Sequence, residues 1–464
     1  MLTINEIATA TNGRIIGHAS GEVTAVSTDS RTVAPGELFV ALRGDRFNGH
    51  DFIADVCAKG ISVVIAEDQW LKGNAVPDGI ACVSVKNSLR ALGDLAANWR
   101  RGFDIPVLGV TGSNGKTTVK EMLATILELT APGLKTAGNL NNLVGLPQML
   151  FKLRPEHRWA VLEMGMSEPG EIDRLAAIAA PRVGIVLNAL PAHLQSMGTV
   201  EAVAAAKGEL LHRISDGGLA VVNADDSRVA SLSQNASARR ISFGIDRGEV
   251  RAKEIESLGL DGQRFHLVTP YGEAMVQLKV CGRHNIYNAL AAAAALLEKV
   301  ELATIVAGLE AFTPYKGRFE IERLGGISLV DDSYNANPAS IKAALETLAQ
   351  IAPAGHRIAV LGDMLELGEH EVDAHRGIGA VAGRSIDRLY LMGELMKQHA
   401  LDGALLSGMP AEAVFCCTSH AEAAELLYQS IAEGDVILVK GSRGMTMEKV
   451  ATELKNLMQT AKGE

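Results

Sequence analysis

The sequence has no excess of basic residues. Its 464 residues carry a formal net charge of −10, and the isoelectric point is about 5.7. Nucleic acids and anionic lipid surfaces attract proteins through clustered lysine and arginine, so this composition argues against a nucleic-acid partner. A polyanionic substrate would need a site that is locally basic.

Long hydrophobic runs are also missing. The most apolar helical stretch, 289–297, is far short of the roughly 20 residues that span a bilayer. The chain starts with "MLTINEIATATNGRIIG", which lacks the basic start and apolar run of a secretory signal. Thr3 and Glu6 in this segment instead fit a helix capping box. We therefore expect a cytoplasmic protein without a membrane span.

Cysteine is scarce and irregularly spaced. The cysteines show no metal-ligand spacing, and the one adjacent pair has poor geometry for a disulfide. They are Cys57, Cys82, Cys281, Cys416 and Cys417. We expect reduced thiols that are mostly packed inside the protein.

The sequence does contain a repeated alternation of short apolar strands with helices. At roughly 100 to 200 residues per domain, its length favours about three domains. Apolar strands that alternate with helices predict an α/β fold with mostly parallel sheets covered on both faces. We expect a small N-terminal α/β domain over 1–82, a linking helix within 83–105, a central domain over 106–312 and a C-terminal domain over 313–464.

Two segments refine this division. The linking helix is predicted by a stripe with helical spacing, formed by Leu89, Leu92, Leu95, Ala96 and Trp99. A β-rich stretch from about Ile241 to Val280 interrupts the central domain before a helix resumes at "RHNIYNALAAAAALLEKV".

The stretch "GVTGSNGKTTVKEM", which begins at Gly109, is typical of a phosphate-binding loop. Backbone N–H groups of a glycine turn and the positive end of the next helix bind phosphate, while Lys116 adds charge and Thr117 can hold magnesium. The match is imperfect, because Val110 stands where the usual motif has glycine. The strand "PVLGV" and the helix "TTVKEMLATILEL" supply the expected context, which favours ATP or GTP binding over an ordinary glycine-rich turn.

Two further polar residues follow neighbouring strands. Glu163 ends "WAVLEMG", close to where a metal beside the phosphate loop needs a carboxylate. The alternative is a solvated acid that faces a loop. His193, in "NALPAHLQSMG", is taken alone more typical of a structural histidine than of a ligand.

Lys207 interrupts an apolar helical face. In "TVEAVAAAKGELLHRI" it lies four residues after Val203 and three before Leu210, on the same stripe. A lysine with its ordinary pKa of about 10.4 is costly to bury while charged. Either its stem lies along the surface with the ammonium in water, or it faces a site where its chemistry is altered. The spacing leaves both possibilities open.

Taken together, these residues resemble the Mur ligase family. The matching segments follow the family's order from about residue 27 to 448, so the resemblance covers nearly the whole chain. They are "TGSNGKTTVKEM", "GNLNNLVGLP", "LEMGMSEPGEI", "PAHL", "VAAAKGEL", "GRHNIYNALAA", "KGRFE", "DDSYNANPAS", "LGDMLELGE" and "VKGSRGMTME". The branch of the family that adds D-alanyl-D-alanine is the most similar, since the chain has "DDSYNANP" and no "DNPR"-type motif of the branch that adds diaminopimelate.

The resemblance implies a role for each domain. The N-terminal domain would bind a UDP-sugar peptide, the central domain would be a P-loop ATPase, and the C-terminal domain would be Rossmann-like. The segment "STDSRTVAPGELFVALRGDRFNGHDF" resembles the part that holds the UDP moiety, although a surface loop tied by Asp29 and Arg31 is an alternative. The implied substrate residues are Ser30, Arg31, Asn48, His50, Asn141, Asn142, Tyr334 and Asn335.

The resemblance also implies roles around the nucleotide. The family's lysine that matches Lys207 carries a carbamate, an anionic ligand for magnesium, which would explain a lysine on an apolar stripe. Thr117 matches a ligand of the first of two magnesium ions, and Glu163 and His193 match positions that help to hold the second. The implied ATP-binding residues are Thr111, Gly112, Ser113, Asn114, Gly115, Lys116, Thr117, Thr118, His284, Asn288, Arg318 and Asp332.

Each of the later positions has an ordinary alternative. Asn285 could cap a helix, Arg318 could form a surface ion pair with Glu320, and the segment from Asn335 to Pro338 could be a plain turn.

The implied reaction is an ATP-dependent amide ligation through an acyl phosphate. The terminal carboxylate of UDP-N-acetylmuramoyl-tripeptide would attack ATP, and D-alanyl-D-alanine would displace phosphate to give the pentapeptide precursor of peptidoglycan. Lys116, Lys207, His193 and Arg318 are the implied catalytic residues. Nothing in the sequence demands an oligomer, so we expect a monomer.

Other functions remain open at this stage. Another Mur-type ligase would share most of the motifs, and a folylpolyglutamate synthase shares the central fold but lacks this N-terminal unit. An ATP-dependent switch without catalysis would need the phosphate loop but not Glu163, His193 and Lys207 together.

Overall fold

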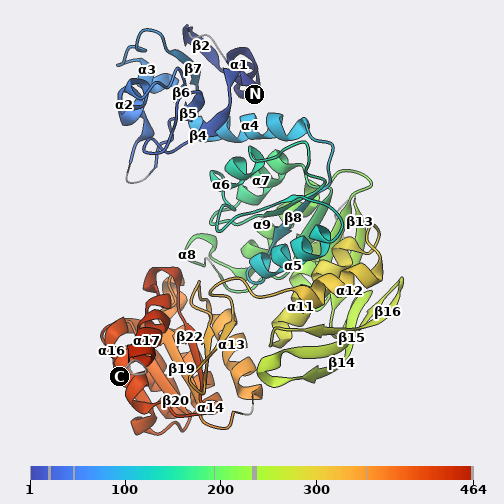
Figure 1. Ribbon diagram of the computed structural model, residues 1–464, viewed down its shortest axis with the longest axis vertical. Helices are drawn as coiled ribbons and strands as arrows, with labels where there is room; N and C mark the ends of the chain where they lie inside the picture. The colour runs from blue at the N-terminus through green and yellow to red at the C-terminus, as the bar shows by residue number, and fades with distance from the viewer. Residues whose placement is uncertain are drawn as a thin grey trace.

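The computed structural model describes residues 2–18, 22–44, 47–192, 194–232, 238–351 and 353–460. The chain forms three lobes along its longest axis, with the N-terminal lobe at one end and the C-terminal lobe at the other (Figure 1). Within the ranges given above, no helix is long and apolar enough to cross a membrane. The expected three-domain α/β architecture is confirmed.

The N-terminal lobe contains a five-stranded sheet in the order β2-β7-β6-β5-β4, parallel except for β2. Its strands are β1 (Leu2–Thr3), β2 (Arg14–Gly17), β3 (Glu22–Val23), β4 (Ala25–Ser27), β5 (Glu37–Val40), β6 (Val63–Glu67) and β7 (Ala81–Val85), and its helices are α1 (Ile4–Thr11), α2 (Ile53–Ala58) and α3 (Asp68–Leu71). The predicted capping box begins α1, because the Thr3 hydroxyl accepts the Glu6 N–H and the Glu6 carboxylate accepts the Thr3 N–H.

Helix α4 (Ser88–Arg101) leads from this lobe into the next and packs against helices of both. Leu92, Leu95 and Ala96 are buried as the apolar stripe predicts. Leu89, on the same stripe, is 37% exposed and lines a surface hollow beside Leu143. The domain bounds 1–82, 83–105, 106–312 and 313–464 stay a prediction.

The central lobe is built on a nine-stranded sheet in the order β16-β15-β14-β13-β12-β11-β8-β10-β9. Its strands are β8 (Val107–Thr111), β9 (Leu134–Lys135), β10 (Ala160–Glu163), β11 (Val183–Val186), β12 (Leu219–Asn223), β13 (Arg239–Gly244), β14 (Val250–Ser257), β15 (Gln263–Thr269) and β16 (Gly272–Leu278). Pairing is parallel from β9 to β14 and antiparallel from β14 to β16, which confirms the predicted β-rich stretch.

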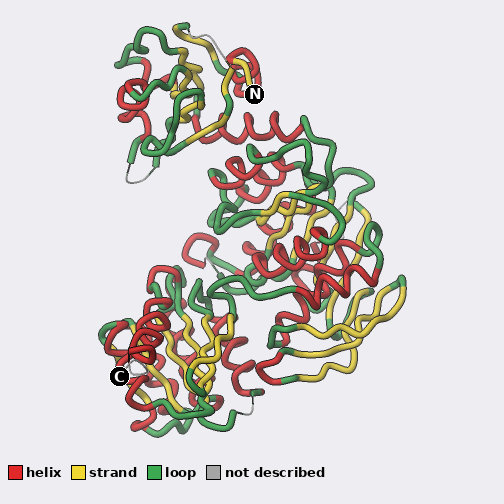
Figure 2. The backbone as a smooth tube through the Cα atoms, viewed as in Figure 1, coloured by secondary structure: helices red, strands yellow, loops and turns green. Residues whose placement is uncertain are grey.

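Helices cover both faces of this sheet, as Figure 2 shows. They are α5 (Lys116–Glu128), α6 (Gly145–Leu150), α7 (Glu171–Ala179), α8 (Leu194–Met197), α9 (Val200–His212), α10 (Ser227–Leu232), α11 (Arg283–Leu296) and α12 (Leu302–Ala311). One core lies under α5, α11 and α12, and another lies under α6, α7 and α9. Strand β8 is buried at all five positions between β10 and β11, so the phosphate loop leaves an inner strand of the sheet.

The C-terminal lobe has a six-stranded sheet in the order β17-β18-β22-β19-β20-β21, parallel except for β17. Its strands are β17 (Glu320–Leu324), β18 (Ile327–Asp331), β19 (Arg357–Gly362), β20 (Arg388–Met392), β21 (Val414–Cys417) and β22 (Val436–Lys440), and its helices are α13 (Pro338–Gln350), α14 (Glu371–Ser385), α15 (Leu401–Leu406), α16 (His420–Ser430) and α17 (Glu448–Thr460). The four inner strands are apolar runs of the kind that the strand–helix alternation predicts, whereas the edge strands β17 and β21 are only partly buried.

Two glycines in helices test how the fold is packed. A Cβ on Gly308 of α12 would lie 2.6 Å from the Ile126 Cα of α5, whereas a Cβ on Gly377 of α14 would meet nothing within 4 Å. Gly308→Ala is expected to lower the free energy of unfolding by about 1 to 3 kcal/mol, because a backbone atom cannot rotate away. Gly377→Ala should raise it by about 0.5 to 1 kcal/mol through helix propensity. Urea unfolding followed by circular dichroism measures both changes in the free energy of unfolding. Changes of the same sign in the two variants would contradict this packing.

Candidate functional site

A cleft of about 880 Å³ lies between the central and C-terminal lobes. On the central side it is lined by the turns that follow β8, β10, β11 and β12, and on the other side by those that follow β18, β19 and β22. The carboxyl ends of parallel strands therefore meet across the cleft, which is where ligands of open α/β sheets bind. Its volume is in the range of small-molecule sites.

The phosphate loop has the strand, turn and helix that its sequence predicts. Val110, at the position where the usual motif has glycine, is fully buried inside β8 and so belongs to the strand. Gly115 caps α5 with a φ of +87°, and a Cβ there would lie 2.3 Å from the Asn288 Oδ1. Only glycine combines this left-handed backbone with such a close neighbour.

Asn188, which follows β11, holds the loop in shape. Its Oδ1 accepts the N–H of Asn114 at 2.9 Å, its Nδ2 donates to the Asn114 carbonyl at 3.1 Å, and its own carbonyl accepts the Ser113 N–H. The Ser113 hydroxyl and the Leu190 backbone complete the support. The sequence analysis missed Asn188, although its place directly after a buried strand is a usable signal.

Four side chains converge where the loop meets β10. The Glu163 carboxylate, 3% exposed, accepts the Thr117 hydroxyl at 3.0 Å and the Asn141 amide at 2.8 Å. Lys116 folds back so that its Nζ donates to the Gly112 carbonyl at 2.7 Å. Burial lowers the pKa of Lys116, nearby Arg318 lowers it further, and Glu163 opposes both. Glu163 is therefore a buried carboxylate and not a solvated acid.

Lys207 on α9 also lines the cleft. It is 3% exposed, so the alternative in which its ammonium reaches water is wrong. Burial, and secondarily the charge of Lys116, hold the pKa of Lys207 well below its usual range. A lysine of this kind is neutral, and so nucleophilic, at a pH where an ordinary lysine is charged.

The oxygen ligands that the protein offers in the cleft suit a magnesium ion that is also bound by phosphate. No group of three or more histidine, cysteine or acidic residues that could hold a metal occurs in the part of the chain that the structure describes. Thr117 and Glu163 nevertheless place a hydroxyl and a carboxylate side by side, and Mg²⁺ at phosphate sites is held by one or two such ligands with the substrate's own oxygens. His193 lies outside the described residues.

The start of α11 forms another wall. His284 lines the cleft, and burial lowers its pKa to about 4, so its imidazole is neutral near pH 7. Asn285 donates to the Cys281 carbonyl at 2.7 Å and accepts from Asn288 at 3.0 Å, but no side chain caps the start of α11, so the capping role considered for Asn285 is wrong. Asp225, which the sequence analysis missed, accepts the Tyr287 hydroxyl at 2.9 Å and ties this helix to the turn after β12.

Arg318 reaches across the cleft from the C-terminal lobe. Its Nη2 donates to the Thr117 hydroxyl at 3.3 Å, and its guanidinium lies 4.1 Å from the centre of the Tyr334 ring. The Arg318 Nε is buried without a hydrogen-bond partner. The side chain thus points at the phosphate loop and keeps one N–H donor without a partner. Glu320, which was considered as an ion-pair partner of Arg318, accepts the Gly317 N–H.

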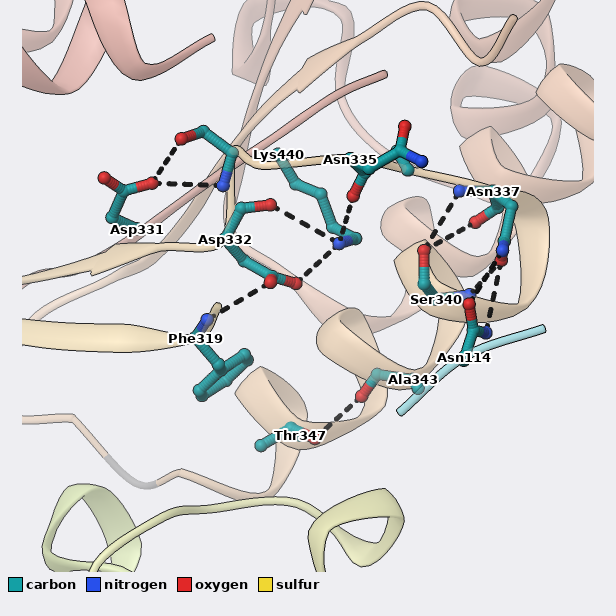
Figure 3. Close-up of polar contacts among 12 residues, drawn as sticks. Asn114, Phe319, Asp331, Asp332, Asn335, Asn337, Ser340, Ala343, Thr347 and Lys440 are labelled. Carbon is teal, nitrogen blue, oxygen red and sulfur yellow. Dashed lines mark hydrogen bonds and ion pairs between the residues drawn. The ribbon is translucent and has the colours of Figure 1, made fainter. Parts of the chain in front are cut away.

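Lys440 is buried and pairs with Asp332, whose side chain is 15% exposed (Figure 3). The Lys440 Nζ lies 2.6 Å from the Asp332 carboxylate and donates to the Asn335 carbonyl at 3.0 Å. Burial lowers the pKa of Lys440, although Asp332 opposes the shift. The other Asp332 oxygen accepts the Phe319 N–H at 3.1 Å. Lys440 was missed, since a lysine that ends a strand carries no distinctive pattern.

A pair of amides joins the phosphate loop to the C-terminal lobe, as Figure 3 shows. The Asn337 Nδ2 donates to the Asn114 Oδ1 at 2.8 Å, and the return bond measures 3.3 Å. Asn337 also caps α13 by accepting the Ser340 N–H at 2.9 Å. The segment considered as a plain turn is therefore also a contact between lobes.

Lys120, one turn after Lys116, is fully buried and was not singled out by the sequence analysis. Its Nζ donates to the Thr136 carbonyl at 2.9 Å and lies 2.6 Å from the Glu121 carboxylate. The Thr136 hydroxyl in turn accepts the Glu163 N–H at 2.9 Å. This chain of contacts fixes the backbone from which the Glu163 carboxylate projects.

The N-terminal substrate candidates lie apart from the cleft lining. Arg31 forms a two-point pair with Asp29, which lowers the pKa of that carboxyl to about 2, and the Ser30 carbonyl accepts the Lys59 ammonium. His50 is buried: its Nε2 accepts the Glu67 N–H, and its Nδ1 contacts the Asn48 amide oxygen at 2.8 Å.

The remaining candidates divide between the cleft and the framework. Asn141, Tyr334 and Asn335 line the cleft, as does Thr118. Asn142 also lines it, but its Oδ1 accepts the Gly145 N–H and so caps α6. Thr111 lies in buried β8, where its hydroxyl donates to the Met164 carbonyl.

Comparison with known proteins matches this arrangement over the whole chain. Family models described as "Mur ligase family, catalytic domain", "Mur ligase middle domain" and "Mur ligase, glutamate ligase domain" match residues 22–100, 110–296 and 317–443. The "UDP-N-acetylmuramoyl-tripeptide--D-alanyl-D-alanine ligase" of Escherichia coli is 37% identical over 462 residues, covering 98% of each chain.

Solved structures show the same similarity. A MurF crystal structure from Acinetobacter baumannii has a TM-score of 0.90 and 36% identity, and covers 98% of this chain and 99% of its own. MurF from Thermotoga maritima in complex with ADP has a TM-score of 0.84 and 28% identity, and covers 94% and 98%. The chain belongs to the Mur ligase family.

Proposed function

We propose that this protein is the ATP-dependent ligase that joins D-alanyl-D-alanine to the terminal carboxylate of UDP-N-acetylmuramoyl-tripeptide. The observation that carries the proposal is the contact of Arg318 with Thr117, because it makes one phosphate site from two lobes. Relatives at 32 to 37% identity over nearly the full chain bear the name of this ligase. Its product is the pentapeptide precursor of peptidoglycan.

The residues of the cleft account for the first half of the reaction. A carboxylate oxygen of the tripeptide attacks the γ-phosphorus of ATP, and the bond from this phosphorus to the bridging oxygen breaks. ADP departs, and the tripeptide becomes an acyl phosphate. Lys116 and the N–H groups of the loop hold the phosphates, and Arg318 stabilises the charge that develops on the transferred group. Magnesium held by Thr117 and Glu163 would neutralise further charge.

Positioning and exclusion of water account for the second half. The amine of the dipeptide attacks the acyl carbon, and the tetrahedral intermediate releases phosphate while the nitrogen loses a proton. An acyl phosphate is hydrolysed if water reaches it, so the C-terminal lobe has to cover the loop during both steps. Neutral His284 and Asn288 would bind the adenine, and Asp332 the ribose.

Lys207 would act as a carbamate. A neutral lysine amine adds to CO2 and loses a proton, which gives an anionic carboxylate on the side chain. The lowered pKa of Lys207 supplies the neutral amine that this addition requires. The product would add a second anionic group to the cleft that Glu163 lines, and with His193 these residues would hold the second magnesium ion.

The substrate would extend from the cleft to the N-terminal domain. We assign the UDP moiety to the turns around Ser30, Arg31, Asn48 and His50, with Asn141, Asn142, Tyr334 and Asn335 along the peptide. The Gln148 amide of α6 donates to the Thr28 hydroxyl at 2.8 Å, so the two lobes touch beside this path. We propose that the N-terminal domain acts in binding and that the enzyme works as a monomer.

The function is tested by incubating the protein with ATP, magnesium and UDP-N-acetylmuramoyl-tripeptide, with and without D-alanyl-D-alanine. We expect phosphate release that depends on the dipeptide and a product heavier by one dipeptide unit, because the acyl phosphate is protected until an amine arrives. Enzymatic phosphate detection and mass spectrometry measure both. A folded protein that binds ATP and forms no product would contradict the proposal.

Lys207→Ala tests the carbamate. We expect loss of ligation by about 100-fold or more, because a magnesium ligand is removed, and partial recovery with added formate, which can occupy the vacated space. Intact-protein mass spectrometry after trapping of the carbamate should show the mass of one CO2 on wild-type protein only. Arg376→Gln, on the surface of α14, is the control. Normal activity of Lys207→Ala without rescue would exclude the assignment.

Closure of the C-terminal lobe is tested by small-angle scattering. ATP analogue together with the UDP-sugar peptide should reduce the radius of gyration, as the lobe turns about residues 313–320 toward the loop. Arg318→Ala should weaken the response, since the contact with Thr117 is lost. An unchanged scattering curve for wild-type protein with both ligands bound would count against closure.

A further inference from the structure

We propose that Arg443 binds the free carboxylate of the incoming dipeptide and thereby selects a substrate with a charged C-terminus. The inference rests on the proposed function, which says that the acceptor is a dipeptide but does not say what recognises it. A dipeptide brings three features to the cleft: a reactive amine, two methyl groups and a carboxylate. The carboxylate lies about 7 Å from the amine in an extended dipeptide, so its partner has to lie away from the phosphate loop.

Arg443 stands where three turns of the C-terminal lobe meet. It begins the short turn Arg443–Met445 just after the central strand β22, and its N–H donates to the Asn335 Oδ1 at 3.1 Å. The neighbouring Ser442 hydroxyl accepts the Leu365 N–H at 2.9 Å, so the turn after β19 is tied to the same point. The backbone of Arg443 is therefore fixed while its side chain lines the cleft.

The other cations that line the cleft have a role at the phosphates, are buried, or lie on the central lobe. Lys116 and Lys207 lie at the phosphate loop, Arg318 contacts Thr117, and Lys440 is buried against Asp332. Arg228 forms an ion pair with Glu201 on the central lobe. Among the described residues, this leaves Arg443 as the cation on the C-terminal wall for which the reaction so far has no use.

The guanidinium of Arg443 is suited to a planar anion. Its side chain is 57% exposed, and its ion pair with Glu448 runs through Nη1 at 2.9 Å. A guanidinium carries five N–H donors on three nitrogens, so one contact does not use up its capacity for a two-point bond to a carboxylate. The centre of the Tyr334 ring lies 6.0 Å from the Arg443 Cζ and 4.1 Å from the Arg318 Cζ, so both arginines contact the same ring.

The surface beside Arg443 complements the methyl groups. Leu365 lines the cleft and is 45% exposed, which is unusual for a leucine in a site of polar residues. A Cβ on Gly444 would lie 2.8 Å from the Leu365 Cδ1, so the apolar side chain lies directly against the turn that carries Arg443. The next residue, Glu366, holds a φ of +64°, a strained value for a residue with a side chain, and such strain gathers at ligand-binding turns.

The test compares D-alanyl-D-alanine with D-alanyl-D-alaninamide, which keeps the amine and both methyl groups but lacks the negative charge. Wild-type protein should show a kcat/KM about 10- to 150-fold higher with the carboxylate, the range for a hydrogen bond to a charged group. In Arg443→Gln this ratio should fall to within about 3-fold of unity, because the substitution lowers kcat/KM for the charged dipeptide and not for the amide. The KM for ATP should stay the same.

Arg376→Gln is the matched control, since it makes the same substitution on the surface of α14 in the same lobe. Its ratio should equal that of wild-type protein. Equal loss of activity with both dipeptides in Arg443→Gln, or an unchanged ratio, would overturn the inference. So would wild-type protein that uses the amide as well as the acid, a result that needs no variant. Absence of ligation by wild-type protein with either dipeptide would instead refute the proposed function.

Discussion

The cost of burying positive charge at the carboxyl end of the central sheet governs the design of this protein. Lys116 and Arg318 lie near the buried Glu163 carboxylate, and Lys207 lies near Lys116. Burial lowers the pKa of both lysines, Arg318 lowers that of Lys116 further, and Lys116 lowers that of Lys207. Such a cluster is unfavourable by itself and becomes favourable when phosphate anions enter. The binding of a nucleotide is thus prepared by a local electrostatic imbalance in a chain whose net charge is −10.

Hydrogen bonds from the surrounding residues hold the charged groups of this cluster in place. Asn188 fixes the phosphate loop, Lys120 and Thr136 fix the backbone at Glu163, and Asp332 fixes Lys440. Each is a polar group with a partner, as burial requires. Preorganisation of this kind means that the charges do not have to move when phosphoryl transfer begins, which is where electrostatic catalysis gains its advantage.

The sequence predicted the elements that are strongly periodic and the residues whose chemistry is local. The inner strands, the phosphate loop and the capping box at Thr3 all follow from short patterns. Lys120 and Lys440 could not be found in this way, because each acts through a neighbour distant in the chain, whereas the place of Asn188 after a buried strand was a usable signal. Leu89 lies on the stripe of α4 and is still 37% exposed, because helical spacing does not by itself decide how far a side chain is covered. Lys207 was placed on the right face, yet only its burial decided between the two possibilities.

The central and C-terminal lobes meet through packed side chains and hydrogen bonds. Cys281 packs into the C-terminal core beside the start of α11, and His284 meets Phe319 edge-on at 6.2 Å. Across the cleft itself, Arg318 and Asn337 contribute bonds of 2.8 to 3.3 Å to the loop.

Each such hydrogen bond is worth only about 0.5 to 1.5 kcal/mol net in water. A nucleotide held by cations from both lobes would add interactions of similar or greater strength. Substrate binding can therefore determine how close the C-terminal lobe lies to the central lobe. Closure would then follow the arrival of the reactants, which is the order that protects an acyl phosphate from water.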